Sequence, residues 1–173
     1  WYVFNDKEGN ATVNVILDHN TTAKVSYNST GNNSEMKEVA DALKTDTKDW
    51  KNTARLITAN EVAKITKHPT FDATQLGQVW FYLDSNNQTQ TTNASNKSKY
   101  AWLFDYTDGC ANYGCNKADS STYGYGYWTS TSYKDNSTLA WRVNRNGNLN
   151  YSNVTSTDYG IRPVITISKS MLN

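Results

Sequence analysis

Short stretches in which hydrophobic and polar residues alternate recur along the chain, a period typical of β-strands with one buried face. Near the N-terminus they read WYVF, ATVNVIL and AKVSYN, and the turn-forming sequences NDKEGN and DHNT separate them. Later stretches are QVWFYLD at 78–84, GYGYWTSTSY at 124–133 and GIRPVITI at 160–167. We predict two or three strands near the N-terminus and one at each later stretch. Pro163 is expected near the start of the last one, because proline cannot donate a ladder hydrogen bond.

Two other stretches space their apolar residues three and four positions apart, as one face of a helix requires. In the first, SEMKEVADALK, this spacing joins Met36, Val39, Ala40 and Leu43. Ser34 precedes them and has a side chain that can cap a helix. We therefore predict a helix that Ser34 caps and that buries these four side chains.

The second helical stretch, LITANEVAKI, has a sharper N-terminal signal. Thr58 and Glu61 are spaced as a capping box, in which each side chain bonds to the backbone N–H of the other residue. Ile57 and Val62 are placed on either side of this cap as a hydrophobic staple. The pair at 68–69, His-Pro, is expected to end the helix.

The order of these elements predicts the fold class. Two helices come early and most strands come late, an arrangement typical of α+β folds. The chain has 173 residues, enough to bury a core in a single domain that spans 1–173. The polar stretch SNNQTQTTNASNKSK at 85–99 is predicted to be an exposed insertion loop, because strongly aromatic sequence resumes directly after it.

The stretch AWRVNRNGNLNYSN at 140–153 predicts a β-hairpin around an Asn-Gly pair. A two-residue turn there would scatter the apolar residues over both faces of the hairpin, which burial of one face disfavours. A loop of three residues at 145–147, with Gly147 in the left-handed conformation, instead pairs Val143 with Leu149. The apolar face then consists of Leu139, Trp141, Val143, Leu149 and Tyr151.

The opposite face of this hairpin is predicted to carry only polar side chains. They are Arg142, Asn144, Asn148, Asn150 and Ser152. A solvated face of an antiparallel sheet is one explanation. A recognition surface is the other, because binding surfaces favour Asn, Arg, Tyr and Ser, whereas ordinary solvated strands more often carry Lys, Glu and Thr. We treat these five residues as candidate ligand contacts that face outward.

Aromatic residues gather before the hairpin, at Tyr123, Tyr125, Tyr127, Trp128 and Tyr133. Such rings either fill a core or stack on the faces of sugars. We expect Trp128 to lie in the core, whereas Tyr123 and Tyr125 belong to a glycine-rich loop and are expected to be exposed. Tyr123, Tyr125 and Tyr133 are therefore added to the candidate ligand contacts.

Two cysteines, Cys110 and Cys115, occur in DGCANYGCNK. Their spacing does not fit the C-x-x-C pattern of redox and zinc sites, and His19 and His68 stand far apart in the sequence. We predict a local disulfide, which stiffens its loop and implies an oxidising, extracellular compartment. Two free thiols in a cytosolic protein are the alternative. No metal site and no cofactor are predicted.

Composition disfavours several classes of function. The formal net charge is +1, so the sequence has no electrostatic footprint of nucleic-acid binding. No apolar run reaches about 18 residues, and we predict no insertion of this segment into a membrane. The chain begins with WYVFND rather than Met, so a signal segment or anchor is expected outside it. Asp105 and Asp108 are expected to cap turns, no cluster indicates acid–base catalysis, and no enzymatic activity is predicted.

Several motifs resemble a known group of bacterial domains with a C-type-lectin-like fold. ARLITANEVAKI resembles the arginine-leucine-x-threonine sequence at the start of a helix in that group. GYWTSTSY, AWRVNRNGNLNY and YGIRPVITI resemble its C-terminal strands and occur in the same order. The motifs are most similar to the C-terminal domains of collagen-like bacterial adhesins (Lcl-type), over residues 54–66 and 125–167.

The resemblance implies a fold in which the N- and C-terminal strands pair, two helices flank them, and an irregular, loop-rich region displays the ligand site. It also implies a non-enzymatic ligand-binding or adhesion module of a bacterial surface or secreted protein, whose partner is a glycan or a host protein. The calcium-dependent sugar motifs of animal C-type lectins are absent from the sequence, so binding is expected without calcium. The expected location is the cell surface, and a phage particle is the alternative.

Two further functions stay open from the sequence, and a third, enzymatic one is disfavoured. In a variable protein of a diversity-generating retroelement, adenine-directed mutagenesis rewrites codons near the C-terminus, and Asn, Tyr and Ser, which cluster at 144–153, are the residues that Asn-type template codons would yield. The globular head of a pilin-like or fibre subunit is compatible with adhesion. An enzyme related to formylglycine-generating proteins would share the fold, but Cys110 and Cys115 do not match the late positions of its reactive cysteines.

Overall fold

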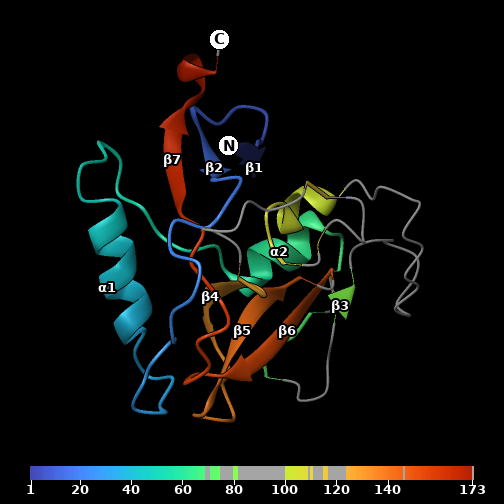
Figure 1. Cartoon of the computed structure of the whole chain (residues 1–173). Coiled ribbons are helices and arrows are strands. Elements are labelled where there is room, and N and C mark those ends of the chain that lie inside the picture. The colour runs from blue at the N-terminus through green and yellow to red at the C-terminus, as the bar shows by residue number, and fades with distance from the viewer. Residues whose placement is uncertain are drawn as a thin grey trace.

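A computed structural model describes residues 1–68, 71–74, 80–81, 100–108, 110, 115–116, 124–145 and 147–172, and of residues 80–81 the backbone alone. In this part of the chain, two α-helices and two antiparallel sheets form a mixed α+β fold (Figure 1). The predicted fold class is therefore confirmed. The predicted loop at 85–99 lies outside the described residues, as does most of the predicted strand at 78–84.

The first sheet joins the two ends of the chain (Figure 1). Its strand order is β1–β2–β7, with β1 at Tyr2–Phe4, β2 at Thr12–Ile16 and β7 at Val164–Ser168. β2 and β7 are antiparallel and pair along the whole length of both strands. The expected pairing of N- and C-terminal strands is thus present, and Pro163 directly precedes β7, as predicted.

The second sheet has the strand order β3–β6–β5–β4. Its strands are β3 at Trp80–Phe81, β4 at Gly126–Ser132, β5 at Leu139–Asn144 and β6 at Asn148–Asn153. All neighbouring strands in it are antiparallel. The strand predicted at 124–133 is β4, which begins two residues later than predicted, at Gly126.

The β5–β6 hairpin has the predicted register. Val143 lies opposite Leu149, and Trp141 lies opposite Tyr151. Gly147 has a φ of 78°, as a loop of three residues with glycine in the left-handed conformation requires. The apolar side chains of both strands therefore share one face of the sheet, which is the arrangement that burial of this face demands.

Helix α1 spans Lys37–Asp46 and begins later than predicted. Met36 is its N-cap residue and provides no side-chain hydrogen bond. Ser34 lies in a preceding turn, where its backbone N–H donates a hydrogen bond to the Asn32 side chain at 2.9 Å. Because this turn holds Ser34 outside the first turn of the helix, the predicted cap is wrong.

The buried face of α1 also differs slightly from its prediction. Val39 is fully buried, and Met36, Ala42 and Leu43 are partly buried around it. Ala40, which helical spacing assigned to this face, is exposed. Ala40 lies at the margin of the apolar stripe, where its short side chain is buried only if a neighbouring part of the protein extends over it. The sequence of the helix does not show how far its neighbours extend.

Helix α2 spans Ala59–Ile65, and its N-terminus has the predicted capping box. The Thr58 hydroxyl accepts a hydrogen bond from the Glu61 N–H at 3.0 Å, and the Glu61 carboxylate accepts one from the Thr58 N–H at 2.9 Å. Ile57 and Val62 are both fully buried in the same core cluster, as a hydrophobic staple requires. The local sequence therefore specifies both the start of this helix and its orientation.

The stretch AKVSYN at 23–28 is not a strand. The Val25 N–H donates to the Tyr159 carbonyl at 2.8 Å, and the Asn28 N–H donates to the Val154 carbonyl at 3.0 Å. Bonds three residues apart do not form an antiparallel ladder, in which alternate residues pair. The segment runs beside residues 154–159 without joining a sheet, so of the two or three strands predicted near the N-terminus two are present.

Two hydrophobic clusters form the core on opposite faces of the second sheet. The larger cluster fills the space between both sheets, α2 and a short 3-10 helix, η1, at Ala101–Phe104; it includes Ile16, Ile57, Val62, Leu103, Trp141, Val143 and Leu149. The smaller cluster lies under α1 and consists of Tyr27, Val39, Leu56, Trp128, Ala140, Val154, Tyr159 and Ile161. The β4–β5 part of the second sheet is therefore buried on both faces.

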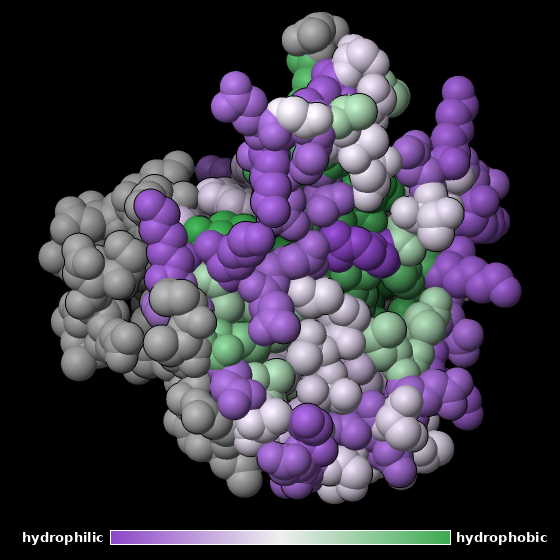
Figure 2. Space-filling model, turned by 180° about the vertical axis from the view of Figure 1, so that it is seen from behind, coloured by the Kyte–Doolittle hydropathy of each residue, from purple (hydrophilic) through white to green (hydrophobic). Residues whose placement is uncertain are grey.

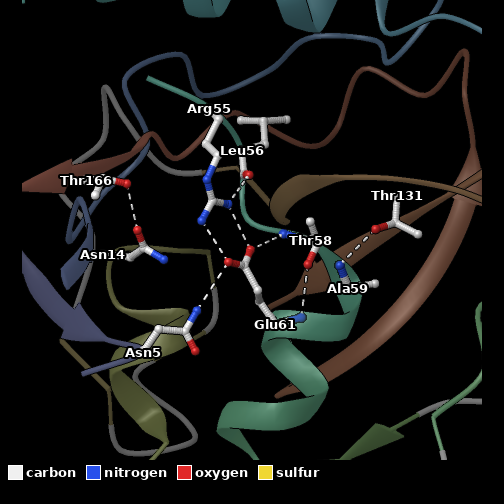
Figure 3. A network of polar contacts seen from close by, with 9 residues as sticks. All are labelled: Asn5, Asn14, Arg55, Leu56, Thr58, Ala59, Glu61, Thr131 and Thr166. Atoms are coloured by element: carbon white, nitrogen blue, oxygen red, sulfur yellow. Dashed lines mark hydrogen bonds and ion pairs between the residues drawn. The ribbon is translucent and has the colours of Figure 1, made fainter. Parts of the chain in front are cut away.

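A polar network holds α2 against both sheets (Figure 3). Arg55 donates hydrogen bonds to the two carboxylate oxygens of Glu61 at 2.8 and 2.7 Å. Asn5, which follows β1, donates to the same carboxylate at 3.3 Å. The Ala59 N–H at the start of α2 donates to the Thr131 hydroxyl in β4 at 2.9 Å. The arginine of the ARLITANEVAKI motif thus has a structural partner three residues beyond the helix cap.

We expect Glu61→Gln to lower the free energy of unfolding by about 1 kcal/mol near pH 7, and by less near pH 3. Burial by itself raises the pKa of Glu61, but the hydrogen bonds from Arg55 and Thr58 outweigh it and hold the pKa below 4.5. A carboxyl group with a lowered folded pKa stabilises the fold above its unfolded pKa, and this contribution is lost as the pH falls through the folded pKa.

Urea denaturation of both proteins at the two pH values measures this difference. Glu8→Gln is a matched control, because Glu8 lies on an exposed turn and its replacement is expected to change stability little at either pH. A cost of Glu61→Gln that is equally large near pH 3 would contradict the assignment to the ionised carboxylate.

The described residues on the face that Figure 2 shows are largely hydrophilic. Hydrophobic surface appears there only in small areas between polar and charged side chains. No helix in the described part of the chain is long and apolar enough to cross a bilayer. This face therefore offers a ligand polar contacts rather than a broad apolar docking surface.

Candidate ligand-binding surface

The polar face of the β5–β6 hairpin is largely covered by the protein itself. Arg142 is only 8% exposed, and Asn148 is 6% exposed. Arg142 lies directly opposite Trp128 of β4, so both side chains project from the same face of the sheet. The Arg142 guanidinium lies 4.2 Å from the centre of the Tyr159 ring. The prediction that Arg142 and Asn148 face outward is therefore wrong, because the smaller core cluster and its surroundings cover this face.

The other three residues of this face, Asn144, Asn150 and Ser152, are half-buried. Asn144 and Arg145 lie at the end of the hairpin, beside its loop. Ser152 lies opposite Ala140, whose side chain is fully buried in the smaller cluster. None of these three side chains is fully covered, so each keeps some contact with solvent.

Tyr133 belongs to the larger core cluster. It is 1% exposed; its ring stacks on Trp141 with the ring centres 5.6 Å apart, and it packs edge-on against Tyr151 at 5.2 Å. This placement contradicts the prediction that Tyr133 contacts a ligand, because a ligand cannot reach a ring that its neighbours cover. Trp128 is fully buried, as predicted, and its indole N–H donates to the Val25 carbonyl at 2.8 Å.

Tyr125 is exposed, as predicted, and it lies in contact with a charged pair. Its side chain is 37% exposed, and the Arg145 guanidinium lies 3.8 Å from the centre of its ring, a cation–π contact. Arg145 also forms an ion pair with the Asp108 carboxylate, and both of these side chains are about a third exposed. We refer to Tyr125, Arg145 and Asp108 as the platform. Tyr123 lies outside the described residues.

Backbone hydrogen bonds hold the segments of the platform together. The Arg145 N–H donates to the Tyr125 carbonyl at 2.7 Å, and the Asp108 N–H donates to the Gly124 carbonyl at 2.9 Å. The Tyr125 N–H donates to the Asp158 carbonyl at 2.8 Å. Four segments that are distant in the sequence are thus fixed relative to one another. A ligand that binds here does not need to order them, which lowers the entropic cost of binding.

Two glycines let the chain around Tyr125 approach its neighbours closely. A Cβ atom on Gly124 would lie 2.2 Å from the Ala23 carbonyl oxygen, and one on Gly126 would lie 1.9 Å from the Val143 carbonyl oxygen. Neither distance leaves room for a side chain. The glycines therefore serve close backbone packing, while the tyrosine between them keeps its ring at the surface.

Cys110 and Cys115 form the predicted disulfide, with their Cα atoms 5.5 Å apart. The Asp105 carboxylate beside them accepts hydrogen bonds from the Asn116 N–H at 2.7 Å, the Asn116 side-chain amide at 3.0 Å and the Tyr2 hydroxyl. Burial and the bond to Asp105 raise the pKa of Tyr2, so its hydroxyl keeps the proton that it donates.

The same three groups, Asp105, Cys110 and Cys115, are close enough together to resemble a metal site. One ligand atom of each lies within 4.8 Å of the other two. The two sulfurs are bonded to each other, however, and the carboxylate already has three hydrogen-bond donors. The Asp105 carboxylate therefore links Asn116 to Tyr2 of β1, and the donor set of this cluster does not suit a metal ion.

The platform combines groups that recognise sugars and proteins. An exposed aromatic ring offers a rigid contact area, and a guanidinium offers hydrogen-bond donors in a fixed plane. Within the described residues, only Nη1 of Arg145 is engaged in a hydrogen bond, so Nε and Nη2 can donate to a ligand. Asp108 contributes little binding energy itself, because the pair is partly exposed, but it orients Arg145.

Sequence reasoning did not identify Arg145 and Asp108 as site residues. Both belong to turn sequences, Arg-Asn-Gly and Asp-Gly, where a charged residue ordinarily faces water. Their contact depends on the pairing of β4 with β5, which no local pattern encodes. The available signal was the position of Arg145 at the tip of a hairpin whose neighbouring loop exposes a tyrosine.

Comparison with known proteins identifies one family. Residues 10–169 match a family described as a domain of unknown function (DUF6273). No curated protein and no solved structure matches the chain significantly. The match includes both helices and all strands except β1, so it covers the second sheet, the disulfide and every residue of the platform.

Proposed function

The chain belongs to the DUF6273 family, and from this premise we propose that it is a non-enzymatic, extracellular ligand-binding module with a C-type-lectin-like fold. The platform is its ligand-binding surface, and the ligand is a glycan or a protein on another cell or host surface. The observation that carries this proposal is the exposed Tyr125 ring with the Arg145 guanidinium fixed against it at 3.8 Å.

The arrangement of the elements supports the fold assignment. The N- and C-terminal strands pair in one sheet, and both helices follow β2 and precede β3 along the chain. The motifs that resemble the C-type-lectin-like group also have structural roles here: Arg55 binds Glu61, and Arg162 is buried against Tyr127. A solved structure of the protein would test this assignment directly.

The disulfide supports an extracellular location. A disulfide between Cys110 and Cys115 persists in an oxidising compartment, whereas cytosolic reductants keep most thiols reduced. The platform also supports binding without calcium. Its single carboxylate, Asp108, is already neutralised by Arg145, and a calcium site needs several free oxygen ligands.

We expect Tyr125→Ala and Arg145→Met each to weaken binding of the ligand by about tenfold or more, because exposed aromatic and arginine side chains dominate the energetics of most recognition surfaces. A glycan array and a panel of immobilised matrix proteins would identify the ligand, and surface plasmon resonance would then compare the variants. Binding that both variants retain in full would remove the platform from the proposal.

Tyr133→Phe is a matched control for Tyr125→Ala. Tyr133 is buried, and its hydroxyl has no hydrogen-bond partner within the described residues, so phenylalanine is expected to preserve both folding and binding. If Tyr133→Phe weakened binding as much as Tyr125→Ala, the loss would reflect a general disturbance of the aromatic core rather than a lost ligand contact.

Two alternatives keep their own tests. A variable protein of a diversity-generating retroelement needs exposed positions in its variable segment. The segment 144–153 meets this requirement only in part, because Asn153 is exposed but Asn148 is buried. A near-copy of this segment in the gene's neighbourhood, differing only at adenines, would establish that function. The head of a pilin-like or fibre subunit would be recognised from the full-length gene.

A further inference from the structure

A second candidate site lies at the C-terminal end of α2 and shares no residue with the platform. It is a surface cavity of about 480 Å³ whose described lining consists of Asn60, Ala63, Lys64, Lys67, His68 and Phe71. We propose that this cavity binds a small organic anion, whose carboxylate lies near Lys64 and Lys67 and whose apolar part lies against Phe71. The volume suits a ligand of this size.

The charges of the lining select the sign of the ligand. Lys64 and Lys67 are both exposed, and neither forms an ion pair within the described residues. No Asp or Glu belongs to the described lining. Glu61, one turn before Lys64, does not belong to the described lining, and its carboxylate is already paired with Arg55. Two ammonium groups at one cavity favour an anionic occupant.

The C-terminus of α2 opposes an anion only weakly. The partial negative charge at a helix end amounts to about half an elementary charge, and α2 has only seven residues. Its last carbonyls are also engaged: the Lys67 N–H donates to the Lys64 carbonyl at 3.2 Å, and the His68 N–H donates to the Ala63 carbonyl at 2.8 Å. The two full positive charges of the lysines therefore dominate the local field.

The conformation of Lys67 is unusual for a lysine. Its φ is 60°, in the left-handed region, and the two hydrogen bonds just described are those of a helix end at which glycine normally occupies this position. Lysine is strained here, and the helix would end equally well with glycine. The lysine side chain therefore contributes something other than the turn, and the cavity that it lines is the nearest feature that could use its charge.

The remaining walls of the cavity are fixed by the core. The Thr66 hydroxyl donates its proton to the Val62 carbonyl at 2.8 Å. In its contact with Nδ1 of the buried His68, at 3.0 Å, this hydroxyl is therefore the acceptor. Phe71 packs edge-on against the buried Trp141, with the ring centres 4.9 Å apart. The imidazole and the phenyl ring are thus held in place before a ligand arrives, as a preformed site requires.

Phenylacetate is a suitable probe, because it joins a carboxylate to an apolar ring. In an NMR titration of the ¹⁵N-labelled chain, we expect phenylacetate to shift the amide signals of residues 63–68 and 71 saturably. Phenylacetamide, which lacks the charge, and acetate, which lacks the ring, are each expected to bind about tenfold more weakly. Equal affinities for phenylacetate and phenylacetamide would overturn the proposal.

Lysine variants assign the binding to this cavity. Lys64→Gln is expected to weaken phenylacetate binding about tenfold, whereas Lys44→Gln, a matched exposed lysine in the last turn of α1, is expected to leave it unchanged. Equal effects of the two variants would show general charge attraction and overturn the proposal. The platform variants Tyr125→Ala and Arg145→Met are expected to leave phenylacetate binding intact, so this test is independent of the proposed adhesion function.

Lys67→Gly separates binding from folding. Glycine relieves the left-handed strain, so we expect the melting temperature to rise by a few degrees, while phenylacetate binding weakens about tenfold. A protein that becomes more stable and yet loses the ligand cannot have lost it through misfolding. If Lys67→Gly bound phenylacetate as well as the wild type, Lys67 would not belong to the site and the proposal would fail.

Discussion

Arg162→Met is expected to lower the free energy of unfolding by about 3 kcal/mol, because it removes a buried group that donates hydrogen bonds to two backbone carbonyls. Arg162 is 1% exposed. Its guanidinium donates to the Leu103 carbonyl at 3.2 Å and to the Asp105 carbonyl, and it lies 4.4 Å from the centre of the Tyr127 ring. Methionine fills a similar volume but donates no hydrogen bond.

The two carbonyls bonded by Arg162 lie at the end of η1, the 3-10 helix that leads to the disulfide loop and to Asp108. Burial lowers the pKa of Arg162, and the Tyr127 hydroxyl and the Asp105 carboxylate oppose this shift. Arginine stays charged at neutral pH because its ordinary pKa lies far above it. These carbonyls and the Tyr127 ring surround the buried charge. Without Arg162 both carbonyls lose a hydrogen-bond donor, so we expect the segment that positions the platform to loosen.

Urea denaturation followed by tryptophan fluorescence measures this effect as a lower midpoint at an unchanged slope. Arg145→Met is the matched control, because the Arg145 side chain is 33% exposed and pairs with a carboxylate that is equally exposed. Its cost is expected to stay below about 1 kcal/mol. Equal costs for the two arginines would mean that the buried hydrogen bonds of Arg162 contribute no more than a surface ion pair.

Gly126→Ala is the second substitution with a large expected effect, a loss of about 3 kcal/mol or more. The φ of Gly126 is 140°, which residues with a side chain rarely adopt. A Cβ atom there would lie 1.9 Å from the Val143 carbonyl oxygen and 3.0 Å from the Asn144 Cα. These are backbone atoms of the paired strand β5, so the clash can be relieved only by separating β4 from β5 where the platform begins.

Gly9→Ala provides the control for this substitution. Gly9 also has a positive φ, 83°, but no atom lies within 4 Å of the position that its Cβ would occupy. Its cost is expected to be about 1 kcal/mol, the strain of the left-handed conformation alone. Thermal unfolding of both variants separates the two terms. A cost for Gly126→Ala no larger than that for Gly9→Ala would show that β4 and β5 adjust without penalty.

The candidate site was only partly predictable, and its residues show why. Tyr125 was identified because glycines flank it, and a loop of that composition leaves its aromatic residue at the surface. Arg142 was misassigned because two residues outside the β5–β6 hairpin determine its exposure. They are Trp128, which lies opposite it in β4, and Tyr159, which is seventeen positions further along the chain. The register of a hairpin shows which residues share a face, but it does not show what covers that face.

The sequence by itself determined the features that a few neighbouring residues encode. These are the Thr58–Glu61 capping box, the three-residue loop that ends at Gly147, and the short-range disulfide. Each depends on spacing along the chain, and each appears in the structure as predicted. The α+β class followed as well, because the order of periodic segments limits how they can pack.

Only the tertiary structure decided which surfaces remain open. It buried Tyr133 and Arg142, brought Arg145 and Asp108 to Tyr125, and left a lysine-lined cavity at the end of α2. The physical reason is that burial is a property of contacts between segments distant in the sequence. Local periodicity states which side chains point the same way, whereas long-range packing determines whether protein or solvent meets them.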